Sequence, residues 1–99
     1  MTPVTDLIER VVDALIALAG LGETIQDEWT YVHDLETVWT ARLRAVAADR
    51  AVAPVPTDLE PAIDRLVAEA GLITDPHRAI DWLSTLPQVA LVALGETAW

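Results

Sequence analysis

His33 and Glu36 are the residues of this chain whose types and spacing come closest to a chemical site. They stand three residues apart in a stretch of helical periodicity, so their side chains can meet on one helix face. The same helical spacing is expected to place Glu28 on one face with Glu36. An imidazole beside carboxylates can transfer a proton or bind a metal ion. Glu36, His33 and Glu28 are therefore the candidate catalytic residues, and His33 and Glu36 are the candidate metal ligands.

A structural role explains the same residues more simply. Glu28 and Glu36 fall inside the apolar stripe of their helix, where a carboxylate is costly unless it is paired. An arginine of another helix, Arg10 or Arg65, would satisfy Glu36 and leave His33 in solvent. Di-iron bundles use Glu-x-x-His on two helices, whereas this chain has His-x-x-Glu once. The sequence alone therefore favours the structural role.

Other catalytic chemistries lack their residues. The chain has no cysteine and no lysine, which excludes thiolate and Schiff-base chemistry. Ser84 is the one serine and has no glycines of a nucleophile elbow around it, so no acyl-transfer triad is predicted. Asp75 and His77 flank Pro76 at a helix start, a pattern that indicates capping. No glycine-rich phosphate loop is present, and we expect no cofactor.

Residues 24–50 are the element that must position these side chains. Apolar residues recur there every three or four positions, and the stretch contains no glycine or proline. This pattern predicts one long, unbroken helix. Thr24 is expected to cap its N-terminus. Its apolar stripe includes Trp29 and Trp39, which we expect in the core.

The stretch from about residue 3 to residue 19 predicts a first helix that ends at Gly20 and Gly22. The short turn after it folds the two helices into an antiparallel hairpin. Apolar residues cover about half of the first helix, and so wide a stripe predicts neighbours on two sides, one of them a second chain. Tryptophans at a stripe edge and at the C-terminus suit the same role. The residues expected in this interface are Val4, Ile8, Val11, Leu15, Leu18, Trp82 and Trp99.

The C-terminal half predicts three shorter helices packed on the hairpin. The proline-containing residues 53–56 end the long helix, and two capping patterns after them begin a third and a fourth helix. Pro87 interrupts the pattern and is expected to start a fifth. Helix and strand remain alternatives for the apolar segment 88–94, and helix is favoured because no second strand is available to pair with it. The prediction is a single all-α domain over residues 1–99, a bundle of four or five helices.

Composition limits the partners of the chain. It has 16 acidic and 6 basic residues, a net charge of −10, so phosphate backbones and anionic lipid repel it. We therefore expect neither nucleic acid nor membrane as a partner. The start of the chain has no basic region of a signal peptide, and we expect a cytoplasmic protein. The apolar fraction of 53% exceeds the usual range, which favours self-association.

These observations lead to two alternative functions. The first is a protein–protein interaction module without catalytic activity, which forms a homo-oligomer (a dimer is favoured) or binds a basic protein. The second is a small helical-bundle enzyme or ligand-binding protein, with a pocket lined by Glu36, Glu28 and His33. The first is preferred because no convincing catalytic set is present.

Overall fold

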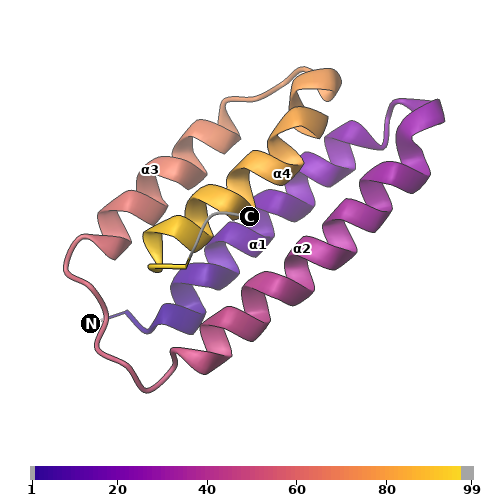
Figure 1. The fold of residues 1–99 in the computed structure, drawn as a ribbon. Coiled ribbons are helices and arrows are strands. Elements are labelled where there is room, and N and C mark those ends of the chain that lie inside the picture. Colours follow the sequence, from indigo (N-terminus) through magenta and orange to yellow (C-terminus); the bar gives the residue numbers. More distant parts are fainter. Residues whose placement is uncertain (1, 97–99) are drawn as a thin grey trace.

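The computed structural model describes residues 2–96, and every regular element in that range is helical (Figure 1). Four α-helices follow one another there: α1 (Val4–Gly22), α2 (Trp29–Asp49), α3 (Leu59–Gly71) and α4 (Pro76–Ala93). One turn of 3-10 helix, η1 (Gln26–Glu28), precedes α2. The predicted all-α class is therefore confirmed.

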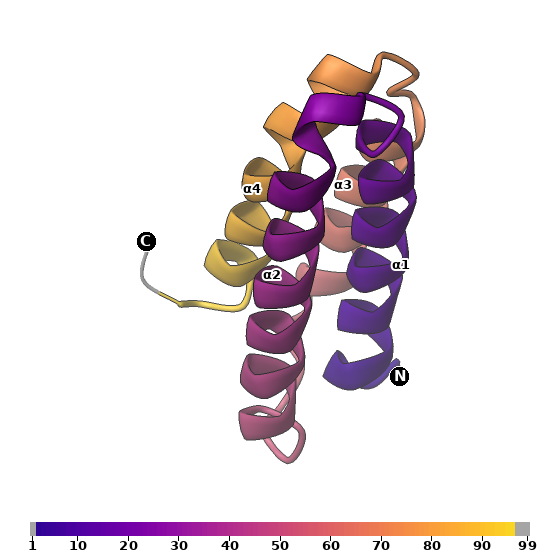
Figure 2. The ribbon, with the colours of Figure 1, turned by 90° about the vertical axis from the view of Figure 1, so that its right-hand side faces the viewer.

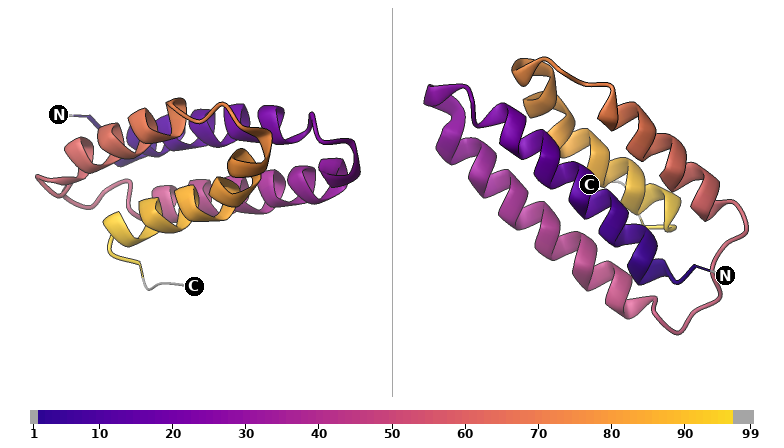
Figure 3. Two further views of the ribbon diagram at one scale, coloured as in Figure 1. Left: turned by 90° about the horizontal axis from the view of Figure 1, so that it is seen from above. Right: turned by 180° about the vertical axis from the view of Figure 1, so that it is seen from behind.

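The helices form an up-and-down bundle in which each runs antiparallel to the one before it (Figures 1 and 2). The bundle is elongated, with dimensions of 43 × 23 × 20 Å. α1 contacts all three other helices and packs most extensively against α4. α2 and α3 lie on opposite sides of α1, as the view from behind in Figure 3 shows. The predicted α1–α2 hairpin is present.

α1 is central to the core, because nine of its residues are buried and it packs against α2, α3 and α4. The five α1 residues that the sequence assigns to an interface with another chain are all buried within this chain, with at most 3% of each exposed. Their apolar surface is already covered by α2, α3 and α4, so none is left for a second chain. Although α1 is strongly apolar, neither it nor any other described helix has the length and apolarity to span a lipid bilayer.

The predicted unbroken helix over residues 24–50 is wrong at its N-terminal end. Thr24 does not cap α2; its hydroxyl donates a hydrogen bond to the carbonyl of Leu21 (2.7 Å), in the last turn of α1. Ile25 is extended, and η1 follows before α2 starts at Trp29. Trp29 is consequently 54% exposed rather than in the core. Trp39 packs partly buried against the core, as expected.

Two helices, not three, follow α2, because Pro87 lies inside α4 instead of starting a new helix. A proline in a helix interior removes one backbone hydrogen bond, which normally ends or bends the helix. Here Leu83, Leu86, Pro87 and Leu91 are all buried on one face of α4, and this burial outweighs the local preference. The helix favoured for the apolar segment 88–94 is confirmed as far as Ala93.

The start of α4 agrees with the capping pattern. A carboxylate oxygen of Asp75 accepts a hydrogen bond from the backbone N–H of His77 (3.2 Å), with Pro76 in the first turn. Such a cap contributes about 1 kcal/mol to helix stability. Asp75 and His77 therefore have a structural role at this helix end.

Candidate metal centre

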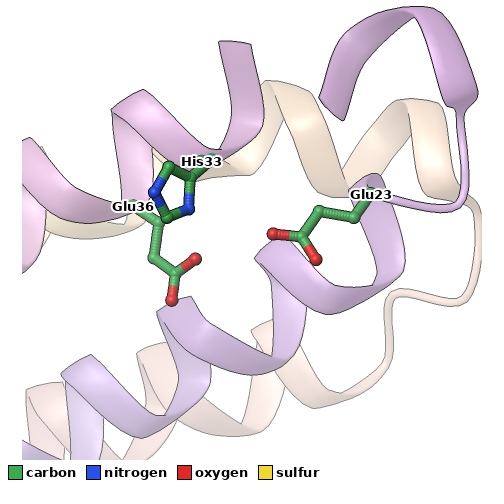
Figure 4. Close-up of side chains that lie close together, drawn as sticks. All are labelled: Glu23, His33 and Glu36. Carbon is green, nitrogen blue, oxygen red and sulfur yellow. The ribbon is translucent and has the colours of Figure 1, made fainter. Parts of the chain in front are cut away.

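Three side chains from the two arms of the α1–α2 hairpin converge beside its turn: Glu23, His33 and Glu36 (Figure 4). Each offers one metal-ligating atom, a carboxylate oxygen or an imidazole nitrogen, and these atoms all lie within 4.8 Å of one another. Glu23 follows the last residue of α1, while His33 and Glu36 lie one turn apart on α2. We refer to these three residues as the Glu23–His33–Glu36 cluster.

Close packing at Gly22 brings Glu23 to α2. A Cβ atom built on Gly22 would lie 2.9 Å from Cγ1 of Ile80 and 3.3 Å from Cγ2 of Val32, so a glycine lets these three segments approach closely. Because Gly22 lies against Val32, the following residue, Glu23, is placed beside His33. The backbone N–H of Glu23 also donates a hydrogen bond to the carbonyl of Ala19 (2.8 Å), which anchors Glu23 to the last turn of α1.

The imidazole of His33 is exposed but held by its own helix. The Trp29 ring stacks on it, with ring centroids 5.7 Å apart and planes inclined by 4°. The backbone carbonyl of His33 also accepts a hydrogen bond from the Thr37 hydroxyl (2.9 Å). The stacking limits rotation of the imidazole, and an ordered imidazole loses less entropy when it binds an ion.

No ion pair balances the two carboxylates of the cluster within residues 2–96. Arg10, one expected partner of Glu36, instead contacts Glu60 (3.3 Å) and Asp64 (2.8 Å) on α3. Arg65, the other, also belongs to α3, on the far side of α1. The structural explanation of Glu36 by an arginine is therefore wrong, whereas the exposure expected for His33 is confirmed. Two half-buried carboxylates remain close together with an imidazole beside them, an arrangement that attracts a cation.

Glu28 does not belong to the cluster. It is the last residue of η1, and the expectation that placed it on one ridge with Glu36 assumed that the long helix already existed there. With η1 in that position, the ridge does not extend back to Glu28. Glu23 takes its place, and sequence periodicity missed it because it lies between two helices. The one feature of the sequence that points to Glu23 is the short turn that contains it, because a short turn brings the end of one helix close to the start of the next.

A shallow hollow of about 400 Å³ lies directly beside the cluster, along α2 and next to α1. His33 and Glu36 belong to its wall, so the cluster opens into it. Thr40 also lines it, and its hydroxyl oxygen is buried without a hydrogen-bond partner among the described residues. An unpartnered buried hydroxyl costs about 1–3 kcal/mol. The residues that line the hollow are Ile16, His33, Glu36, Thr37, Thr40, Ala41 and Arg44.

Arg44 lines the hollow about two helical turns further along α2 than Glu36. Its Nε and Nη2 atoms donate hydrogen bonds to the two carboxylate oxygens of Glu9 on α1, at 3.1 and 3.0 Å. These hydrogen bonds, and then the negative charge of Glu9, raise the pKa of the Arg44 guanidinium. Arg44 is therefore a permanent positive charge beside the hollow, and its Nη1 is not used by Glu9.

The remaining predicted interface residues lie elsewhere. Trp82 is half-buried and lines a second hollow, of about 290 Å³, where α3 turns into α4; Glu69, Leu72, Ile73 and Arg78 complete its wall. Trp99 lies outside the described residues. The structure thus separates Trp82 from the Glu23–His33–Glu36 cluster, which belongs to the α1–α2 turn.

Comparison with protein-family models, with curated proteins and with solved structures finds no match to this chain, so the assignment of a function depends on the geometry of this cluster.

Proposed function

We propose that this protein binds a transition-metal dication, with Zn²⁺ as the best match, through Glu23, His33 and Glu36. The observation that carries the proposal is the convergence of one carboxylate from the α1–α2 turn with one carboxylate and one imidazole from α2, with no arginine paired to either carboxylate within residues 2–96. This proposal develops the ligand-binding alternative, with Glu23 in place of Glu28, and departs from the expectation of no cofactor.

The donor set supports a transition metal rather than Ca²⁺ or Mg²⁺. Imidazole nitrogen is a good ligand for Zn²⁺, Fe²⁺ and Ni²⁺, whereas Ca²⁺ and Mg²⁺ take oxygen ligands. Zn²⁺ binds nitrogen and oxygen at about 2.0–2.2 Å, so ligand atoms of a tetrahedral site lie about 3.4 Å apart. The present separations, at most 4.8 Å, reach that value by rotation of the glutamate side chains.

Three protein ligands leave at least one coordination position open. Structural zinc sites are usually closed by four protein ligands, whereas three ligands plus water are typical of sites that bind or transform a ligand. The open position adjoins the hollow, because His33 and Glu36 belong to both. The site is therefore of the ligand-binding kind.

We expect the metal-free protein to bind one Zn²⁺ per chain in isothermal titration calorimetry. His33→Ala, Glu23→Gln and Glu36→Gln should each weaken Zn²⁺ binding by at least about 10-fold. Mutation of a residue that only contacts a metal ligand already lowers metal affinity by about 10-fold or more, so loss of a ligand itself should cost at least as much. Free Zn²⁺ at 100 times its Kd should also raise the free energy of unfolding of the wild type by about 2.7 kcal/mol.

The chain offers matched controls for this experiment. His77 is the other histidine and Glu28 is a nearby glutamate outside the cluster, so His77→Ala and Glu28→Gln should leave Zn²⁺ affinity unchanged. Ca²⁺ should bind much more weakly than Zn²⁺. Equal losses in His33→Ala and His77→Ala, with both variants folded by circular dichroism, would show that Zn²⁺ binds adventitiously.

A second candidate function, association with a second copy of the chain, is favoured by a different observation. Large apolar side chains remain exposed on α2 and α4, two helices that pack against each other, among them Tyr31, Val38, Val89 and Val92. Exposed apolar surface on neighbouring helices is a feature of interfaces. This surface replaces the α1 stripe, which is buried. Trp82, near the turn between α3 and α4, is a further contact residue for this association.

Light scattering is expected to detect a dimer at micromolar concentration, and the dimer fraction should increase with salt because each copy carries a charge of −10. Val38→Asp should reduce dimer formation, whereas Val52→Asp, the same change at an exposed position outside the helices, should not. A monomer at all salt concentrations would remove this candidate. Capture of a basic protein, the other expected partner, would instead weaken with salt.

A further inference from the structure

We propose that the hollow beside the Glu23–His33–Glu36 cluster binds a small dicarboxylate, with one carboxylate on the metal ion and the other on Arg44. The inference rests on the proposed function, because the metal supplies one of the two contacts. It goes further by naming the chemical class of the ligand and the residues that select it.

The hollow has a positively charged group at one end and, once the metal is bound, at the other. His33 and Glu36 bring the metal to the first end, and the Arg44 guanidinium lies at the second. Arg44 already binds one carboxylate, that of Glu9, through Nε and Nη2. Its Nη1 still has protons to donate, and guanidinium groups bind carboxylates with charge-assisted hydrogen bonds.

Thr40 supplies a second, independent indication of a polar ligand. Its hydroxyl oxygen is buried beneath the hollow and has no hydrogen-bond partner in the described part of the chain. Rotation about χ1 moves a threonine hydroxyl between staggered positions. A carboxylate bound to Arg44 would accept a hydrogen bond from this hydroxyl, which would then lose the cost of being unpartnered. Ile16 and Ala41 provide apolar walls for the carbon chain between the two carboxylates.

Charge makes the binding of the acid depend on the metal. Without the metal, the carboxylates of Glu9, Asp13, Glu23 and Glu36 outnumber the one guanidinium and repel an anion. A bound dication cancels two of the three excess negative charges and gives the anion a positive ion to bind. The dicarboxylate should therefore bind the zinc-loaded protein and not the metal-free protein, and by linkage it should tighten zinc binding by the same factor.

Succinate is a suitable probe, and acetate, which reaches only one end of the hollow, is its control. Calorimetric titration of succinate into zinc-loaded protein should detect binding at least about 10-fold tighter than that of acetate, the effect of one charge-assisted hydrogen bond. Arg44→Leu should weaken succinate binding by about 10-fold or more and leave acetate and Zn²⁺ affinity unchanged. Thr40→Val should weaken succinate binding less.

Glu9→Gln is the decisive variant, because it removes the competitor for Arg44 without touching the metal ligands. It should tighten succinate binding. The inference is overturned if zinc-loaded wild type does not bind succinate, if succinate binds no more tightly than acetate, or if Arg44→Leu and Glu9→Gln have no effect on it. In each of these cases the zinc titration still measures Zn²⁺ binding by the cluster. The absence of dicarboxylate binding in the hollow is therefore distinguished from the absence of the metal site.

Discussion

Replacing Leu15 with alanine is expected to lower the free energy of unfolding by about 2–5 kcal/mol, the usual cost of a fully buried leucine. Leu15 has no exposed surface and lies in α1, which packs against all three other helices. Its removal leaves a cavity that α2, α3 and α4 cannot fill by a small shift of any single helix. Urea unfolding followed by far-UV circular dichroism measures the effect.

Leu72→Ala is the matched control, because it is the same substitution at a leucine that is 81% exposed. It should change the free energy of unfolding by no more than about 0.5 kcal/mol. The pair also decides the role of the α1 stripe. If Leu15→Ala altered the subunit number while the stability of the monomer stayed the same, Leu15 would belong to an interface between chains and not to the core.

Gly22→Ala is expected to destabilise the protein by about 1–3 kcal/mol, because an added methyl group overpacks the contact between α1, α2 and α4. The new Cβ would lie 2.9 Å from Ile80 and 3.3 Å from Val32, so one of these side chains or a helix must move. Movement of α1 away from α2 would also separate Glu23 from His33. We therefore expect weaker Zn²⁺ binding in addition to a lower urea midpoint.

Gly20→Ala makes the same change two residues earlier in the same helix. A Cβ atom on Gly20 meets nothing within 4 Å, and alanine is the better helix former, so this variant should be more stable by up to about 1 kcal/mol. Its Zn²⁺ affinity should match that of the wild type. If both variants were stabilised, the close approach at Gly22 would not exist in solution, and the placement of Glu23 would lose its explanation.

Much of the candidate site was accessible from the sequence, and the missing part has a physical cause. His33 and Glu36 lie one turn apart on a helix, and helical spacing predicts their contact. The same spacing wrongly included Glu28, because periodicity does not reveal that the chain runs through an extended residue and η1 before α2 begins. Glu23 was missed because its contact with His33 depends on how two helices pack at Gly22, and no local pattern records that packing.

The fold, like the candidate site, was predicted in part from the sequence and depends in part on tertiary packing. Apolar periodicity determined that the chain is helical, approximately where α1 and α3 lie, and that the first two helices form an antiparallel hairpin. These are local properties, set by side chains three or four residues apart. Pro87 is an exception to these local properties. A proline normally ends a helix, but buried residues before and after Pro87 keep α4 continuous. The end of α1 was predicted too early, because the helix continues past residue 19 and through Gly20 to Gly22.

Only the tertiary structure decided what the apolar stripe of α1 faces and which carboxylates stand together. The sequence predicts that the apolar stripe of α1 is buried; its residues are Val4, Ile8, Val11, Leu15 and Leu18. Burial against another chain and burial against α2, α3 and α4 both remove this apolar surface from water, so the sequence does not distinguish them. The hydrophobic effect has no direction, so it does not choose a partner. The choice comes from the packing of all four helices together, and the position of Glu23 beside His33 and Glu36 is one of its consequences.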